Sequence, residues 1–209
     1  MDRRHFLVIA SGAFSMPAAV LAQDRFVEGQ HYATLSQRQP TRDPSQVEVL
    51  EFFAYGCSHC SAFEPALDAW QKRLPPAVLF RRIPVAFRAS AVIQQRLYFA
   101  LEALGLVEQL HRKVFYAIHS ERQALDTPKE IGEFVARNGA DAKTVLQTLD
   151  SFGVASKAKQ ASSLMTGYKL EGTPSIGVNG RWLTSGSMAG SNERSLAVAD
   201  YLISLARTT

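Results

Sequence analysis

The sequence predicts an α/β protein in which a long all-helical stretch interrupts the sheet-forming segments. Residues 47–55 are rich in β-branched and aromatic side chains and lead directly into residues 58–70, whose apolar positions have helical spacing. Helical spacing then dominates from about 89 to 168. Strand-like residues return at 175–184, and a last helix is expected over 192–206. This order of elements indicates an α/β core with a helical insertion.

The remaining strands are shorter. Asn179-Gly180 is a dipeptide typical of two-residue hairpin turns, because both positions accept a positive φ. A loop rich in glycine and serine is expected after this hairpin. Strands are expected near 31–35, over 78–85, and on the two sides of the hairpin turn, over 175–178 and 181–184.

Helix boundaries within the helical stretch have recognisable capping residues. Thr127 to Glu130 form a capping box, with a proline at the first helical position. Gly105 and Asn138-Gly139 are expected to end helices, and Asp141 is expected to begin one. These signals predict several short helices rather than one long helix.

The N-terminus, residues 1–22, has the pattern of a cleavable export signal. Arg3 and Arg4 precede an apolar segment that is too short and too interrupted to span a membrane as a stable helix, and Ala22 suits cleavage. Arg3-Arg4-His5-Phe6-Leu7 also resembles a twin-arginine motif, although Asp2 stands where Ser or Thr is usual. The general secretory route and the twin-arginine route both remain open, and both lead to a compartment where disulfides persist.

Composition narrows the classes of partner. The formal net charge is +4, and the basic residues are scattered along the chain, so we expect no nucleic-acid partner. The chain after residue 22 is long enough for one domain carrying a large insertion. No second apolar segment is long enough to cross a bilayer.

The only two cysteines, Cys57 and Cys60, lie where the strand turns into the helix. A helix N-terminus lowers the pKa of a cysteine there, because its unpaired N–H groups and partial positive charge stabilise the thiolate. Two residues three apart on a first turn are close enough for a disulfide, yet so short a loop adds little chain-entropy stabilisation. A reversible redox pair is therefore favoured over a structural disulfide or half of a metal site.

The chain resembles the thioredoxin-fold proteins and, within them, the DsbA family of periplasmic disulfide oxidases. The resemblance spans nearly all of the chain after residue 22. It depends on a helical insertion of matching size and place, and on four short motifs: Glu51-Phe52-Phe53, Cys57-Ser58-His59-Cys60, Phe63-Glu64-Pro65 and Gly172-Thr173-Pro174.

This resemblance implies a thioredoxin fold with an inserted all-helical subdomain: residues 23–87 and 169–209 form the thioredoxin-like domain, and residues 88–168 form the insertion. It implies a periplasmic thiol-disulfide oxidoreductase that donates its disulfide to unfolded exported proteins with free thiols. It also implies reoxidation by a membrane quinone-coupled oxidase of the DsbB type. We expect a monomer with no cofactor and no metal.

Site residues follow from the same motifs. In the family the proline matching Pro174 is cis and faces the cysteine pair, so Thr173 and Pro174 are expected to bind substrate backbone. Ser58 stands where the best-known members have proline, and Gly56 stands where many have an aromatic residue. Both departures lie beside the reactive sulfur and leave the redox potential open.

Cys57 is expected to be the exposed nucleophile and Cys60 its buried partner. His59 is expected to stabilise the Cys57 thiolate through its ring, although an exposed histidine that only fills the turn is the alternative. Glu51 would have a raised pKa if buried and could accept protons during thiol exchange; alternation along the strand could instead turn it to solvent. Glu64 is a second candidate for proton transfer.

The other histidines carry no such argument: His111 is expected at the edge of the core, and His31 and His119 at the surface. The nearest rival function is a periplasmic disulfide reductase or isomerase on the same fold. A rival from another class is a copper or zinc carrier that uses the Cys-Ser-His-Cys motif, although such a site would need further ligands. A third alternative is a redox-inactive binding module, and the intact cysteine pair argues against it.

Overall fold

A computed structural model describes residues 26–208 of the chain, so the predicted signal peptide lies outside the described residues. The centre of the fold is a five-stranded mixed sheet with the strand order β1-β5-β4-β2-β3. Strand β2 pairs in parallel with β3 and antiparallel with β4, and β4 and β5 form the predicted hairpin. The strands are β1 (Ala33–Thr34), β2 (Val47–Phe53), β3 (Val78–Pro84), β4 (Ser175–Val178) and β5 (Trp182–Ser185).

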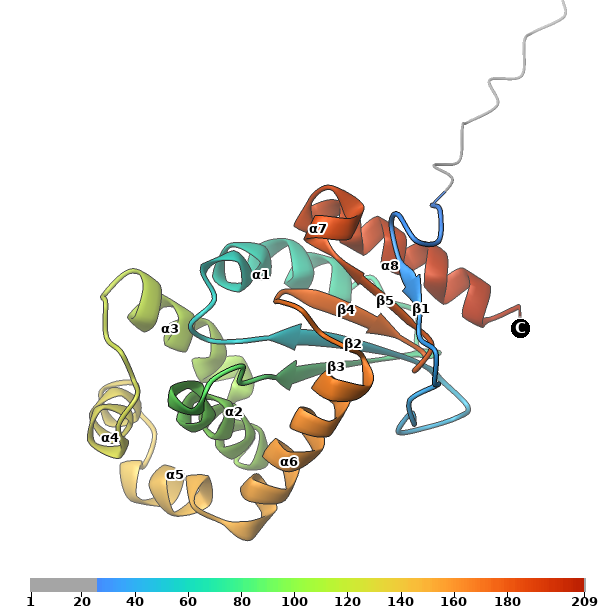
Figure 1. The fold of residues 1–209 in the computed structure, drawn as a ribbon. Helices are drawn as coiled ribbons and strands as arrows, with labels where there is room; N and C mark the ends of the chain where they lie inside the picture. Colours follow the sequence, from blue (N-terminus) through green and yellow to red (C-terminus); the bar gives the residue numbers. More distant parts are fainter. Residues whose placement is uncertain (1–25, 209) are drawn as a thin grey trace, which may run out of the picture.

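Helices cover both faces of this sheet. Figure 1 shows α1 and α8 on one side of the sheet and α6 on the other. Helices α2–α6 form the middle segment, and α3, α4 and α5 lie towards and beyond the end of the sheet where β2 leads into α1. A short 3-10 turn, Ala89–Ala91, precedes that segment. The helices are α1 (Ser58–Gln71), α2 (Val92–Ala103), α3 (Val107–His119), α4 (Pro128–Arg137), α5 (Ala142–Leu149), α6 (Phe152–Gly167), α7 (Gly186–Ala189) and α8 (Asn192–Ala206).

Each face of the sheet has its own apolar cluster. Val49 contributes to the cluster beneath α1 and α8, which also contains Phe63 and Leu202. Leu50 and Phe52 contribute to the second cluster, which continues into the helices of the middle segment. Because both faces are covered, all seven residues of β2 are buried.

The capping signals read from the sequence form the expected contacts. The Thr127 hydroxyl oxygen accepts the Glu130 N–H at 3.2 Å, and the Asp141 carboxylate accepts the Thr144 N–H at 3.0 Å. Gly105 and Gly139 both have a positive φ just after a helix end, as a left-handed cap requires. These local signals correctly predicted where the helices of the middle segment begin and end.

Two details differ from the sequence-based expectation. The loop expected after the hairpin contains a short helix, α7, whose N-cap Ser185 accepts the Met188 N–H. Strand β2 ends at Phe53 rather than at residue 55, because the Cys57 N–H bonds back to the Ala54 carbonyl at 3.0 Å and closes a turn. Within residues 26–208, no helix is both long and apolar enough to cross a membrane.

Candidate active site

The cysteine pair is positioned by the turn that joins β2 to α1. Cys57 is the N-cap of α1, with an extended backbone, and Cys60 lies in the first helical turn. Both are free thiols in this structure. The Cys57 sulfur accepts the Cys60 N–H at 3.3 Å, which satisfies one of the unpaired donors at the helix start. The N-cap position predicted from the strand-to-helix change is therefore confirmed.

The two thiols have opposite environments. Cys57 is half-buried, and Cys60 has no exposed surface. The hydrogen bond from the Cys60 thiol lowers the pKa of Cys57 to about 5, with burial opposing it and with Thr173 and the N–H groups of Cys60 and His59 lowering it further. Burial, followed by the neighbouring Cys57, raises the pKa of Cys60 well above its ordinary value. Cys57 is therefore the thiolate of the pair at neutral pH.

The loop before β4 meets the cysteine pair from the other side. The Thr173–Pro174 peptide bond is cis, as the resemblance implied. The Cys57 thiol lies 3.3 Å from the Thr173 carbonyl oxygen, so the loop and the start of α1 are in direct contact. A carbonyl and an adjacent strand beside a reactive sulfur suit an extended peptide.

Cavities lie on both sides of this contact. One, of about 910 Å³, is lined by His59, Thr173, Pro174 and Met188 among others. The second, of about 590 Å³, is lined by Cys57, Thr173 and the half-exposed Phe87. A chain bound at Thr173 therefore has room for side chains on either side of the sulfur.

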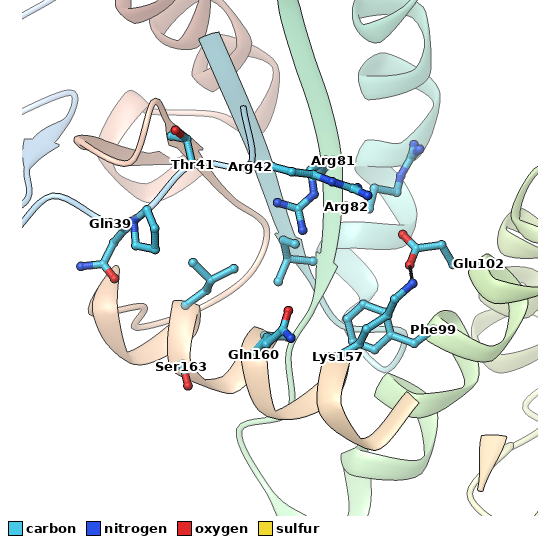
Figure 2. Close-up of a pocket in the computed structure, with 14 residues that line it drawn as sticks. Gln39, Thr41, Arg42, Arg81, Arg82, Phe99, Glu102, Lys157, Gln160 and Ser163 are labelled. Carbon is cyan, nitrogen blue, oxygen red and sulfur yellow. Dashed lines mark hydrogen bonds and ion pairs between the residues drawn. The ribbon is translucent and has the colours of Figure 1, made fainter. Parts of the chain in front are cut away.

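A third cavity lies away from the cysteines. Figure 2 shows it between α6, β3 and the loop that contains Thr41 and Arg42, with Arg81 and Gln160 lining its opening. Its volume is about 550 Å³, and the ion pair between Lys157 and Glu102 closes one end at 2.6 Å. Neither cysteine lines this cavity, so it does not belong to the thiol site.

Ser58 and His59, between the cysteines, are both exposed. Among the described residues, the His59 ring has no hydrogen-bond partner. The backbone N–H of His59, not its ring, is the group that lowers the pKa of Cys57. The predicted contact between the ring and the thiolate is thus absent from this structure, while the backbone of the same residue lowers the pKa of Cys57.

Glu51 is buried rather than turned to solvent, because both faces of β2 are covered. Burial, followed by the nearby Glu64 carboxylate, raises the pKa of Glu51 to about 8, and Arg82 opposes the rise. Arg82 Nε lies 3.1 Å from a Glu51 carboxylate oxygen, without hydrogen-bond geometry. The Glu51 carboxyl group is therefore mostly protonated at neutral pH. Glu48, on the opposite face of β2, is paired with Arg81 at 2.8 Å.

Glu64 is also buried, three per cent exposed, and lies on α1 beyond the cysteines. Burial alone would raise its pKa, but a hydrogen bond from His111 and the nearby charge of Arg82 more than offset this and lower it. Arg82 contacts Glu64 at 3.2 Å and Asp68 at 2.7 Å. Two buried carboxyl groups with different protonation states thus share one arginine.

Sequence reasoning missed Arg82 and misplaced His111 and His119. His111 is four per cent exposed and lies inside the core rather than at its edge. His119 is partly buried rather than at the surface, and its ring bonds to the Tyr55 carbonyl. The His31 ring accepts the Val27 N–H in an exposed contact, which agrees with the expected surface position. No local pattern could have revealed these partners, because the contacts made by Arg82 and by the two α3 histidines join segments far apart in the sequence.

Comparison with known proteins places this geometry in one family. Residues 48–198 match the family described as "DSBA-like thioredoxin domain". The Pseudomonas aeruginosa protein named thiol:disulfide interchange protein DsbA is 36% identical over 201 residues, which cover 96% of this chain and 95% of the relative. The Azotobacter vinelandii protein of the same name is 39% identical over 180 residues, covering 86% and 84%.

Solved structures agree with the sequence comparison. The crystal structure of Pseudomonas aeruginosa DsbA superposes with a TM-score of 0.85 at 37% identity, covering 88% of this chain and 95% of that one. An oxidoreductase DsbA from Xylella fastidiosa gives 0.82 at 29% identity, covering 88% and 98%. The chain therefore has the thioredoxin-like fold, with helices inserted between β3 and β4. It belongs to the family of DSBA-like thioredoxin-domain proteins, which are thiol:disulfide oxidoreductases.

Proposed function

We propose that this protein is a periplasmic dithiol oxidase that donates a Cys57–Cys60 disulfide to exported proteins during oxidative folding. The opposite environments of the two thiols carry the proposal, since one is accessible with a lowered pKa and the other is buried with a raised pKa. The names of the relatives, thiol:disulfide interchange proteins, support the same reaction.

The reaction needs two thiol exchanges. A substrate thiolate attacks the Cys57 sulfur, the Cys57–Cys60 bond breaks, and Cys60 leaves and takes a proton because its thiolate is strongly disfavoured. A second substrate thiolate attacks the substrate sulfur of this mixed disulfide, and Cys57 leaves as a stable thiolate. Two electrons pass from the substrate thiols to the enzyme, which ends with both cysteines reduced.

The low pKa of Cys57 makes its disulfide oxidising, because it stabilises the reduced enzyme. A value of about 5 is two units below neutral pH. Each unit below the ambient pH corresponds to about 30 mV for a two-electron couple, so the effect is about 60 mV relative to a thiol that titrates near pH 7.

Other groups have supporting roles in this proposal. The Thr173–Pro174 loop binds the substrate backbone by strand addition, with little preference for sequence. Glu51, mostly protonated at neutral pH, and Glu64 supply and accept the proton that Cys60 exchanges. His59 and Ser58 tune the thiolate, His59 through its backbone N–H and its ring.

Localisation and partners extend the same proposal. Residues 1–22 act as the export signal, residues 23–87 with 169–209 form the thioredoxin-like domain, and residues 88–168 form the inserted subdomain. The protein acts as a monomer, and a membrane quinone-coupled oxidase of the DsbB type reoxidises it. The named relatives support a role with exported substrate proteins.

Substitution of the two cysteines tests the reaction. Cys57→Ser and Cys60→Ser should both abolish oxidation of a reduced, unfolded substrate, because neither variant can form the Cys57–Cys60 disulfide. Cys60→Ser should in addition accumulate mixed disulfides when its Cys57 thiolate attacks a disulfide of an oxidised substrate, because Cys60 is no longer present to attack Cys57 and release the substrate. Non-reducing electrophoresis after acid quenching measures both. Alkylation of Cys60 in preference to Cys57 at low pH would reverse the assigned roles.

Equilibration with glutathione separates the oxidase from its rivals. We expect a potential well above that of thioredoxin, about −270 mV. A value at or below it would indicate a reductase. Copper or zinc retained through purification in a stoichiometric amount would indicate a metal carrier.

A further inference from the structure

Tyr55, two residues before Cys57, is contacted at both ends by helix α3. Its side chain is one per cent exposed. Its hydroxyl lies 2.8 Å from Nδ1 of His111, and its carbonyl oxygen lies 2.8 Å from Nε2 of His119. Since Tyr55 belongs to the turn between β2 and Cys57, two side chains of the inserted helices fix the backbone that carries the reactive sulfur.

Proton positions along this chain of contacts follow from the groups involved. His111 Nε2 lies 3.2 Å from a carboxylate oxygen of Glu64, which can only accept when ionised. Nε2 of His111 therefore carries the proton, and Nδ1 accepts from the Tyr55 hydroxyl. Nε2 of His119 likewise donates to the Tyr55 carbonyl. Burial lowers the pKa of His111, which keeps this ring neutral.

Helix α3 thus contacts both segments that define the thiol site. Through Tyr55 it contacts the turn, and through Glu64 it contacts α1, the helix that begins beside Cys57. The Tyr55 ring also packs against Phe115 of α3, with ring centroids 5.1 Å apart. The Cys57 sulfur accepts the Cys60 N–H at 3.3 Å, and this hydrogen bond stabilises its thiolate. That distance depends on how the turn is placed relative to α1.

We propose that His111 and His119 are positioning residues for the thiol chemistry: by binding Tyr55 at both ends, helix α3 sets the placement of Cys57 against the N–H groups at the start of α1. This inference rests on the proposed function, which it extends from the cysteine turn to the inserted helices. Neither histidine touches the sulfur atoms in this role.

Conservative substitutions in the full reduced chain test the inference. Tyr55→Phe removes only the hydroxyl and keeps the ring contacts. His119→Leu removes the donor to the Tyr55 carbonyl, and His119→Gln restores an N–H donor of similar reach. Tyr116→Phe, on the same helix and 60% exposed, is the matched control. The readout is the midpoint of the pH profile for alkylation by iodoacetamide. This profile reports on Cys57, because Cys60 is buried and does not react with the reagent.

We expect Tyr55→Phe and His119→Leu to raise the midpoint by about half a unit or more, which is about a twofold loss of thiolate at pH 5. His119→Gln should return it towards the wild-type value, and Tyr116→Phe should leave it unchanged. The glutathione equilibrium should shift towards the disulfide in the same order. Urea melts that remain cooperative show that the variants are folded.

Three results are distinguishable. A low wild-type midpoint that Tyr55→Phe and His119→Leu both retain would overturn the positioning role and leave the proposed function intact. An ordinary cysteine midpoint in the wild-type protein would contradict the proposed function itself. A midpoint that rises equally in His119→Leu and His119→Gln would also overturn the role, because the donor would then be irrelevant.

Discussion

The sheet together with α1 and the helical segment α2–α6 differ in the ionisable side chains that they bury. Within residues 26–208, the three buried carboxyl groups, Glu48, Glu51 and Glu64, all lie on β2 or α1. Helices α2–α6 bury two polar side chains, Gln95 and His111, and no acidic one. The helical segment is therefore stabilised by apolar packing and caps, whereas the sheet and α1 depend on the partners of their ionisable groups.

This difference assigns a structural role to the helical segment and a chemical role to the sheet and α1. Burial of an apolar side chain is favourable wherever it occurs, so the helical segment tolerates many arrangements of similar volume. A buried carboxyl group is stable only in a protonated form or beside a cation. Its protonation state is then set by a specific neighbour, which is what proton transfer requires.

Removal of the shared cation should have the largest effect on stability. Arg82→Met would leave Glu51, Glu64 and Asp68 without their common partner, and the loss of one side of a buried ion pair costs about 3–5 kcal/mol. Urea melts at pH 7 measure it. The loss should shrink as the pH falls through the lowered pKa of Glu64, because Glu64, which is ionised beside Arg82 at neutral pH, then becomes protonated.

The matched control for this variant is Lys157→Met, which breaks the ion pair with Glu102. Both partners are at least 40% exposed, so the expected cost is below about 1 kcal/mol. Equal losses for the two variants would contradict the contrast between the two parts of the molecule.

Redox state should produce the next largest effect. The pKa of Cys57 in the folded reduced protein, about 5, lies below the unfolded value of about 8.5. A lowered pKa stabilises the fold above it, and the contribution fades as the pH falls through the folded value. We expect the reduced form to be more stable than the oxidised form at pH 7, and about 2 kcal/mol of this advantage to disappear by pH 4.

Paired urea melts of the two redox forms at pH 7 and pH 4 measure this advantage. A more stable oxidised form at pH 7 would point to a reductase. An advantage of the reduced form that does not change between the two pH values would mean that the Cys57 thiolate is not its cause.

Loss of a helix cap should have a smaller effect, and one that is independent of redox state. Thr127→Ala removes the acceptor for the Glu130 N–H, which costs about 1 kcal/mol. The thiol pKa should not change, since α4 does not contact the cysteine turn through any hydrogen bond found in residues 26–208. Thermal melts and the alkylation profile of Cys57 together check both statements, and a shifted profile would contradict the second.

The smallest effect on the fold is expected from His59→Ala. His59 is exposed, so the circular dichroism spectrum should not change. Its backbone N–H remains in the variant, and only the ring is lost, so the Cys57 pKa should rise by less than about one unit. An unchanged alkylation midpoint and glutathione equilibrium would mean that the helix terminus tunes the thiol alone.

Local signals were enough for much of the fold. The hairpin followed from Asn179-Gly180, whose φ values are both positive, and the helix starts followed from Thr127 and Asp141. The position of Cys57 at the start of α1 followed from a strand that changes directly into a helix. Each of these depends on residues within a few positions of one another, so the sequence contains the whole physical cause.

The tertiary structure alone decided the protonation and position of the buried groups. Glu51 is buried on a strand that is covered on both faces. Its pKa depends on Arg82, which lies thirty-one positions later in the sequence. His111 and His119 meet Tyr55 only because α3 packs against the turn before Cys57. Burial and charge pairing act across space, and a local sequence pattern does not contain the distance between two distant segments.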